Sequence, residues 1–282
     1  MFILLTPHII PLNPWADQNQ YVDSPDRKSF LADFGPGGKY ENTVGIYREN
    51  QSAEKIGIFD KALIDGLPSS VRWIAHNGAG YDPVDVNACR AKGKKSVSRE
   101  VPITSFKLGT GIYLSNTPEA VDDATATTAL YLLISTIRQF SIAERSLRAL
   151  TWKPAGLGRI AHDLTGKTLA ILGLGGIGTR LAALVQPFPM RVVYHSRRRN
   201  LNAPDFCEYF SNVEEMLALA DILSVHVPLR HDTVGLVGER WIRALKPGAI
   251  IINTARGKVI DEDAMIRALE DGHVSVSKQS SG

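Results

Sequence analysis

The stretch from Thr168 to Gly178 reads Thr-Leu-Ala-Ile-Leu-Gly-Leu-Gly-Gly-Ile-Gly, and it decides the fold. Its apolar start, residues 169–172, has the length of a buried strand, and residues 179–186 have the spacing of an amphipathic helix. A strand, a Gly-x-Gly-x-x-Gly turn and a helix in this order form the dinucleotide-binding fingerprint. The stretch therefore predicts a parallel α/β sheet with a nucleotide site at the turn.

Each glycine of this turn has a physical task. Gly173 permits the sharp turn, Gly175 lets the backbone approach a pyrophosphate, and Gly178 lets the helix pack closely on the strand. Gly176 and Ile177 lie at the start of the helix, where unpaired N–H groups and the positive end of the dipole favour an anion. A purely structural turn is the alternative, and the flanking strand and helix weigh against it.

The composition is that of a globular protein long enough for two domains, with 282 residues, 44% hydrophobic and 22% charged. The net charge of +3 is too small to predict binding to nucleic acid or to a membrane. The two cysteines, Cys89 and Cys207, suggest neither a disulfide framework nor a metal site, and they fit a reducing compartment. We expect a cytoplasmic protein without a signal peptide, a membrane span or a metal.

The rest of the chain supplies the elements of two sheets. Before the fingerprint we expect an irregular segment over residues 1–40 with a short helix at 26–34, strands at 44–47, 71–75 and 112–114, helices at 61–64 and 85–92, one long helix at 120–150 and a loop at 152–162. After it we expect strands at 191–194, 222–227 and 249–253 and helices at 214–220, 241–245 and 261–271.

The end of the strand at 191–194 bears on the choice of cofactor. An NAD site usually carries a carboxylate there for the ribose 2′-hydroxyl, but this strand is followed by His195-Ser196-Arg197-Arg198-Arg199. Guanidinium groups bind phosphate through charge-assisted, bidentate contacts. We therefore predict a preference for NADP, with NAD as the other cofactor considered and a solvated basic loop as the structural alternative.

Two further loops follow predicted strands. His76-Asn77-Gly78-Ala79-Gly80-Tyr81-Asp82 is a glycine-rich loop whose N–H groups could hold an anion, although an ordinary turn has the same composition. Arg256 follows the strand at 249–253, where side chains enter the ligand crevice of a parallel sheet. A structural arginine paired with a carboxylate is the alternative for this residue.

Taken together, these motifs resemble the D-isomer-specific 2-hydroxyacid dehydrogenases. The resemblance covers about residues 56–273 and rests on four motifs in the same order, namely Asn77-Gly78-Ala79-Gly80-Tyr81-Asp82, Gly173-Leu174-Gly175-Gly176-Ile177-Gly178, His226-Val227-Pro228-Leu229, and Asn253-Thr254-Ala255-Arg256-Gly257 followed by Val259-Ile260-Asp261. Residues 116–118 and 120–125 are most similar to the branch of glyoxylate and hydroxypyruvate reductases and D-mandelate dehydrogenases.

The resemblance implies a Rossmann NAD(P)-binding domain over residues 125–282, and a flavodoxin-like substrate domain over residues 1–124. It implies reversible reduction of a small 2-keto acid to the 2-hydroxy acid by NAD(P)H, in a homodimer. Arg256 would bind the substrate carboxylate and polarise the keto oxygen, and the loop of Asn77, Gly78, Ala79 and Gly80 would bind the carboxylate through N–H groups. The implied cofactor residues are Gly173, Gly175, Gly176, Ile177 and Gly178 for the pyrophosphate, Ser196, Arg197 and Arg198 for the 2′-phosphate, and Val227, Pro228, Thr254 and Ala255 for the nicotinamide and adenosine side.

The sequence departs from the family pattern in two places. After Gly272 the family continues with a Gly-Leu-Asp-Val strand, a catalytic Glu and a catalytic His, whereas this chain reads His273-Val274-Ser275 and ends at Gly282. We therefore expect a sixth strand that is cut short, no closing helix and no Glu–His pair, with general acid catalysis of roughly 10²–10⁴-fold lost. His226 and His231 do not replace the pair, because His226 belongs to the strand motif and is expected to be structural.

The second departure is residues 94–111, which follow neither a helical nor a strand pattern and fall where the family has no residues. Because Gly93-Lys94 and Val274-Ser275 can each be encoded across a splice donor, we hypothesise intron read-through at both places, which sequencing of the transcript would test. On that hypothesis we expect low stability and aggregation. A non-catalytic module that binds NADP(H) or another protein is the alternative function.

Overall fold

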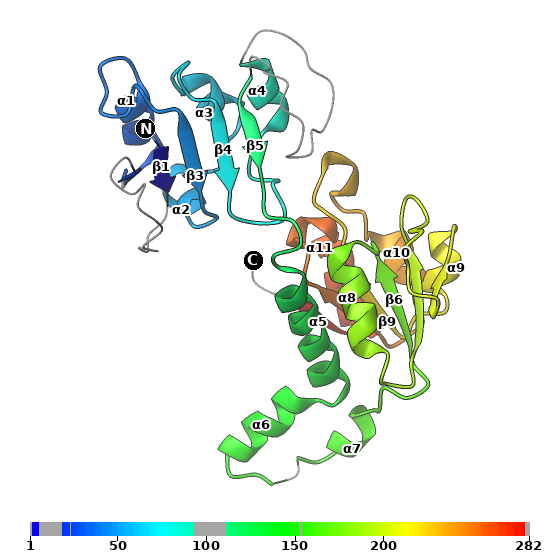
Figure 1. The fold of residues 1–282 in the computed structure, drawn as a ribbon. Coiled ribbons are helices and arrows are strands. Elements are labelled where there is room, and N and C mark those ends of the chain that lie inside the picture. The colour runs from blue at the N-terminus through cyan, green and yellow to red at the C-terminus, as the bar shows by residue number, and fades with distance from the viewer. Residues whose placement is uncertain (1, 6–18, 23, 93–110, 153, 280–282) are drawn as a thin grey trace. The chain divides into compact units, whose positions relative to one another are not determined.

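The computed structural model describes residues 2–5, 19–22, 24–92, 111–152 and 154–279. The chain forms two compact units, Met1–Pro118 and Glu119–Gly282 (Figure 1). The sequence predicted the division between residues 124 and 125. The division falls earlier because the first helix of the second unit, α5 (Asp122–Ile137), packs along α8 (Gly176–Val185) of that unit.

The second unit holds a six-stranded sheet in the order β11-β10-β9-β6-β7-β8, with every pairing parallel. Its strands are β6 (Thr168–Leu172), β7 (Arg191–His195), β8 (Cys207–Tyr209), β9 (Ile222–Val225), β10 (Ala249–Asn253) and β11 (Val274–Gln279). In chain order this is the 3-2-1-4-5-6 arrangement of a Rossmann sheet read from the other edge. The predicted fold class is confirmed for this unit.

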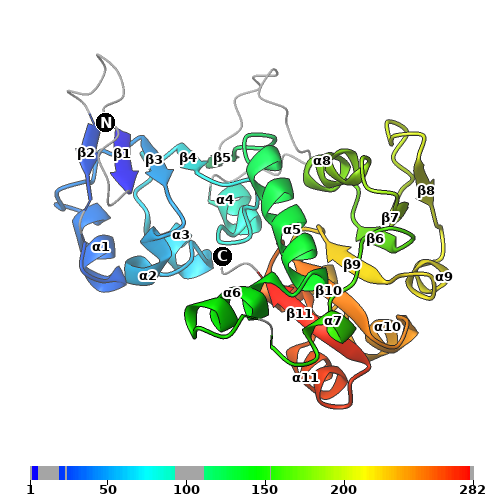
Figure 2. The same cartoon turned by 90° about the horizontal axis from the view of Figure 1, so that it is seen from below.

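Helices cover both faces of this sheet, because its strands are apolar on both sides. Leu169 and Ile171 pack in one cluster with residues of α5 and α8, whereas Ala170 and Leu172 pack in another with residues of α9, α10 and α11. The two clusters alternate along β6 as the period of two in a strand requires. The helices on the second face are α9 (Val213–Leu217), α10 (Glu239–Ala244) and α11 (Glu262–Glu270), seen in Figure 2.

The first unit is a five-stranded parallel sheet in the order β2-β1-β3-β4-β5, which is the flavodoxin-like arrangement. Its strands are β1 (Phe2–Leu5), β2 (Asn19–Tyr21), β3 (Gly45–Arg48), β4 (Trp73–His76) and β5 (Tyr113–Ser115), and its helices are α1 (Arg27–Phe34), α2 (Ser52–Ile56), α3 (Lys61–Gly66) and α4 (Val86–Ala91). Phe30, Phe34 and Phe59 are fully buried in its core, with ring centroids 4.5 Å apart for Phe30 and Phe34 and 6.2 Å apart for Phe30 and Phe59.

The helix predicted over residues 120–150 is two helices, α5 and α6 (Phe140–Arg148), so that prediction was wrong. The chain breaks at Gln139, whose φ of 56° is left-handed. The side-chain amide of Gln139 donates to the carbonyl oxygen of Thr136 at 2.9 Å, and the same carbonyl accepts from the backbone N–H of Gln139 at 3.2 Å. The loop predicted at 152–162 contains one helical turn, α7 (Leu157–Ile160).

Other expectations for the two chain ends need correction. Residues 1–40 are not irregular throughout, because β1 and β2 lie there and pair in parallel with each other. The sixth strand is not cut short relative to its neighbour, since β11 pairs with β10 from Ala249 to Asn253. Apart from Gly111, the predicted atypical insert at 94–111 lies outside the described residues. None of the helices in the described part of the chain combines the length and apolarity that a bilayer crossing needs.

Candidate functional site

The glycine turn joins β6 to α8 as the sequence predicts. Gly173 has a φ of +95°, and a side chain there would approach Val227 Cγ1 to 3.0 Å. A methyl group on Gly178 would overlap the carbonyl oxygen of Gly173, so helix and strand could not pack as closely. Gly173 and Gly178 are thus required by the fold itself.

Gly175 differs from these two residues. It is the N-cap of α8 with a negative φ of −86°, and an added Cβ would have no atom within 4 Å. No neighbouring atom therefore requires a glycine at this position, and the missing side chain leaves space beside the N–H groups of the first helical turn. Gly176 and Ile177 are the first residues of α8, which places their N–H groups at the positive end of the helix dipole.

The loop after β7 is tied to this turn. Ser196 Oγ accepts a hydrogen bond from Leu174 N at 2.9 Å, and Asn200 Nδ2 donates to Leu174 O at 3.0 Å. The hydroxyl predicted to meet a 2′-phosphate thus has an acceptor role already, while its own hydrogen remains available to donate.

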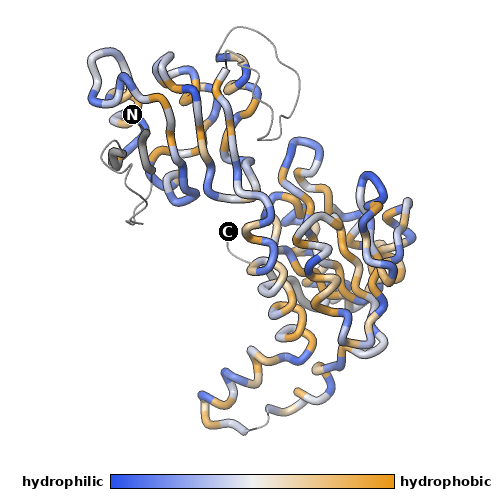
Figure 3. The backbone as a smooth tube through the Cα atoms, in the orientation of Figure 1, coloured by the Kyte–Doolittle hydropathy of each residue, from blue (hydrophilic) through white to orange (hydrophobic). Residues whose placement is uncertain are grey.

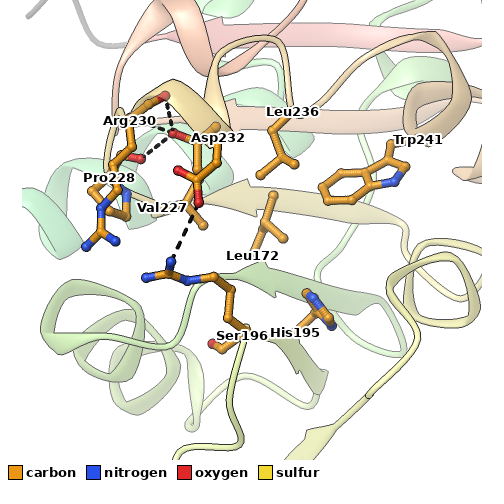
Figure 4. A pocket seen from close by; sticks show the side chains of 11 residues that line it. Leu172, His195, Ser196, Val227, Pro228, Arg230, Asp232, Leu236 and Trp241 are labelled. Atoms are coloured by element: carbon orange, nitrogen blue, oxygen red, sulfur yellow. Dashed lines mark hydrogen bonds and ion pairs between the residues drawn. The ribbon is translucent and has the colours of Figure 1, made fainter.

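A cavity of about 140 Å³ opens beside the turn, at the carboxyl ends of β6, β7 and β9 (Figure 4). It is lined by Leu172, His195, Ser196, Arg197, Val227, Pro228, Arg230, Asp232, Thr233, Leu236 and Trp241. Leu172, Val227, Leu236 and Trp241 make an apolar floor, and charged groups surround its rim. An apolar slot with a polar rim next to a phosphate-binding turn fits an adenosine group.

The charged rim carries both signs. Arg197 Nη1 lies 3.6 Å from Asp232 Oδ2, and Arg230 lines the same cavity. Both members of the Arg197–Asp232 pair are more than half exposed, so the pair is readily separated by a competing anion. Arg198 is exposed and lies outside the cavity lining.

The residues predicted for the nicotinamide and adenosine side divide into two groups. Val227 and Pro228, which follow β9, line the cavity, whereas Thr254 and Ala255, which follow the neighbouring strand β10, do not. His226 bonds Ser224 Oγ at 2.8 Å, and burial lowers the pKa of His226 to about 4. A neutral imidazole at the carboxyl end of β9 fits the structural role that the sequence predicts for His226.

Arg256 lies in a loop after β10 whose backbone is held by hydrogen bonds to the side chain of Asn253. The buried amide of Asn253 accepts from Ala255 N and donates to Arg256 O, both at 2.9 Å. The Arg256 guanidinium is partly exposed, and its Nη1 donates to Ala255 O at 2.9 Å. Asn253 was quoted only as part of a motif, yet its side chain fixes the loop from which the arginine projects.

In the first unit, the loop of Asn77 to Gly80 follows β4. Thr117 forms two hydrogen bonds with Gly78. Gly78 N donates to Thr117 Oγ1 at 3.1 Å, and Thr117 N donates to Gly78 O at 3.0 Å. Asn116 Nδ2 donates to Ala79 O at 2.7 Å. The N–H of Gly78 is therefore engaged by a hydroxyl, whereas those of Ala79 and Gly80 donate to no described residue.

Sequence reasoning missed several of these residues. Arg230, Asp232 and Trp241 gave no local signal, because they reach the cavity from the segment after β9 and from α10. Burial raises the pKa of Cys89 to about 12 and that of Cys207 to about 11, so neither is a reactive thiolate. No cluster of three metal-ligating side chains occurs among the described residues.

Comparison with known proteins agrees with this geometry. Residues 130–277 match the family model described as "D-isomer specific 2-hydroxyacid dehydrogenase, NAD binding domain". Glyoxylate reductase 1 of Saccharomyces cerevisiae is 36% identical over 265 residues, which is 92% of this chain and 70% of that protein.

Two solved structures are similar in fold and sequence. A glyoxylate reductase from Paecilomyes thermophila has a TM-score of 0.83 and 35% identity. The holo form of D-mandelate dehydrogenase from Rhodotorula graminis has a TM-score of 0.83 and 27% identity. Each alignment covers 99% of this chain and 80% of the other.

Proposed function

The chain belongs to the D-isomer-specific 2-hydroxyacid dehydrogenases, and on this premise we propose that it reduces a small 2-keto acid to the 2-hydroxy acid with NAD(P)H. The observation that carries the proposal is the open space at Gly175 beside the apolar cavity, because together they fit a pyrophosphate joined to an adenosine. Binding of NADPH, followed by its fluorescence, tests the cofactor half of the proposal. Oxidation of NADPH upon addition of a keto acid tests the other half.

In this reaction the nicotinamide would supply the hydride, and solvent would supply the proton that the resulting alkoxide takes up. The N–H groups of Gly176 and Ile177 would hold the pyrophosphate at the start of α8. Arg256 binds the substrate carboxylate and draws electron density from the keto oxygen, so that the carbonyl carbon accepts a hydride more readily. In the first unit, the N–H groups of the loop after β4 that donate to no described residue would suit an anion such as a carboxylate.

NADP is the cofactor we propose, with Arg197 and Ser196 as ligands of the 2′-phosphate. Support comes from β7, which ends without a carboxylate, and from Arg197 and Arg230 in the cavity lining. Arg198 is also assigned to the 2′-phosphate on family resemblance. The test is the ratio of dissociation constants for NADH and NADPH in wild type, R197M and R198M. If the proposal holds, R197M lowers this ratio at least tenfold, a loss of about 1.4 kcal/mol of discrimination.

Glyoxylate, hydroxypyruvate and phenylglyoxylate are the substrates we propose to test. Glyoxylate and the keto acid of mandelate correspond to the names of the relatives described above. The substitution R256K keeps the charge but removes the planar fork, whereas R256M removes both. We expect the two variants to lower kcat/KM in that order, with R256M losing at least about 100-fold.

We further propose that the protein is a homodimer joined through α6 and the segment after it. Phe140, Leu147, Leu150 and Trp152 are 49%, 56%, 95% and 85% exposed. Figure 3 shows hydrophobic and hydrophilic segments alternating along α6, as expected for a helix with one apolar side. Exposed apolar side chains of this kind, on α6 and just after it, favour burial against a second copy. Light scattering of the purified protein tests this.

A further inference from the structure

Arg48 is a fully buried charged residue among those that the structure describes in the first unit. Its side chain is 0% exposed at the carboxyl end of β3, and its Nε and Nη2 have no hydrogen-bond partner among the described residues. The guanidinium lies 5.4 Å from the centroid of the Phe59 ring, which provides a cation–π contact. Burial lowers the pKa of Arg48, and Asp82 partly offsets this. A buried cation is costly, which suggests a purpose beyond packing.

The buried guanidinium of Arg48 contacts the side chain of His76. Arg48 Nη1 lies 3.0 Å from His76 Nδ1, at the end of the neighbouring strand β4. A guanidinium can only donate, so Nδ1 of His76 is the acceptor and carries no hydrogen. The hydrogen of the neutral ring must then be on Nε2. Arg48 thereby determines the tautomer of His76.

The other ring nitrogen of His76 points to the loop predicted to bind a carboxylate. His76 Nε2 lies 2.9 Å from Gly80 O, and with the tautomer set it is the donor. The loop fits closely over the ring, because a Cβ on Gly78 would be 2.9 Å from His76 Nε2. Arg48 also holds the start of the loop, since its carbonyl oxygen accepts from Asn77 N at 2.8 Å.

The anchored carbonyls decide where the loop's N–H groups point. In a trans peptide the C=O and the following N–H point in opposite directions. Thr117, Asn116 and His76 hold the carbonyls of Gly78, Ala79 and Gly80. The N–H groups of residues 79, 80 and 81 are therefore directed away from these anchors, and none of the three donates to a described residue.

We infer that His76, set by Arg48, is a positioning residue that adds Tyr81 N–H to the donors for the substrate carboxylate. The donor set becomes residues 79, 80 and 81, in place of 78, 79 and 80, because the N–H of Gly78 already donates to Thr117. Successive N–H groups that donate to no described residue suit the two oxygens of a carboxylate. This inference rests on the proposed function, since it assigns a role within the binding of the keto acid.

Two substitutions of His76 separate its two hydrogen bonds. H76N places an amide where Nδ1 lies, so it can accept from Arg48 but cannot reach Gly80. H76Q places an amide where Nε2 lies, so it can still donate to Gly80 O. The probe is oxamate, an unreactive isostere of a 2-keto acid, and its dissociation constant is measured by calorimetry with NADPH saturating. The melting temperature and the NADPH dissociation constant of each variant serve as controls of folding.

We expect H76N to weaken oxamate binding about tenfold or more, because Tyr81 N–H is no longer held toward the carboxylate, and H76Q to remain within about threefold of wild type. H76Q removes the Nδ1 atom that accepts from Arg48, so the buried guanidinium loses a partner and the fold could suffer for that reason alone. The double variant R48M/H76Q removes the buried charge as well, and its oxamate affinity is measured in the same way. The inference is overturned if folded H76N binds oxamate like wild type, or if H76Q and the double variant weaken as much as H76N. Should wild type bind NADPH but no oxamate, the proposed substrate class fails, and this inference fails with it.

Discussion

The carboxylate of Asp122, in the first turn of α5, occupies the space where a side chain on Gly176, the first residue of α8, would begin. A methyl group on Gly176 would overlap Asp122 Oδ2, so glycine is needed there for a reason that the nucleotide fingerprint does not give. The contact places a carboxylate beside the N–H groups that we assign to the cofactor pyrophosphate. The neighbouring Asp123 is engaged differently, in an ion pair with Arg180 of α8.

We predict that D122N binds NADPH more tightly than wild type. The charged carboxylate repels the pyrophosphate, and removing one charge at this range is worth about threefold to tenfold in the dissociation constant. Burial, followed by the charges of Glu119 and Asp123, raises the pKa of Asp122. Wild-type affinity should therefore rise as pH falls toward that raised pKa, because protonated Asp122 no longer repels. Equal affinity of D122N and wild type at neutral pH would contradict this prediction.

Alanine substitutions at two glycines of the turn should affect NADPH binding and the stability of the fold separately. G175A adds a methyl group to open space, so we expect a melting temperature close to that of wild type and loss of NADPH binding. G178A pushes a methyl group into the Gly173 carbonyl, so we expect a lower free energy of unfolding by about 1–3 kcal/mol. Thermal unfolding and fluorescence titration of both variants test this. Retained NADPH affinity in G175A would mean that the pyrophosphate lies elsewhere.

Asp232 should oppose the 2′-phosphate. It pairs with Arg197 at 3.6 Å in the cavity lining, so a bound 2′-phosphate must compete with it and is repelled by its charge. We expect D232N to lower the dissociation constant of NADPH about threefold or more while that of NADH changes less than twofold. D205N, at an exposed carboxylate outside the cavity lining, is the control. A parallel change for both cofactors would show that Asp232 does not act on the 2′-phosphate.

The dimer proposal predicts a selective effect of charge on α6. L147E introduces a carboxylate into the exposed apolar stripe, whereas L201E does so at a side chain 90% exposed in the loop after β7. If α6 forms the interface, light scattering should show a monomer for L147E and a dimer for wild type and L201E, because a buried unpaired charge is costly. The same mass for L147E and wild type would exclude this interface.

The helices and strands were predicted best where a continuous run of apolar residues, or a glycine at a turn, is compatible with only one kind of secondary structure. The boundaries of Ala249–Asn253 were predicted correctly because both faces of that strand are covered and all five residues are apolar or turn-forming. The break at Gln139 could not be predicted, because a left-handed glutamine stabilised by its own side chain has no sequence signature. The strand Phe2–Leu5 was passed over because prolines follow it closely in the sequence.

The candidate site divides in the same way. Gly173, Gly175 and Arg256 could be selected as candidates from motifs, since each follows a strand end that the sequence predicts, and their roles stay predictions. The partners Asp122, Asp232 and His76 depend on contacts between segments distant in sequence, so only the folded chain brings them into view. The cytoplasmic location, the intron read-through and the low stability stay predictions.

The most direct test of the account is a single-turnover experiment with enzyme in excess over NADPH, followed by absorbance of the reduced nicotinamide after addition of glyoxylate or phenylglyoxylate. Because every bound NADPH reports, even slow chemistry is detected. We expect a decay of this absorbance that depends on the keto acid, yields the 2-hydroxy acid and is slowed at least about 100-fold in R256M. Stable absorbance with every 2-keto acid, in protein that binds NADPH, would contradict it and would favour a binding module without catalysis.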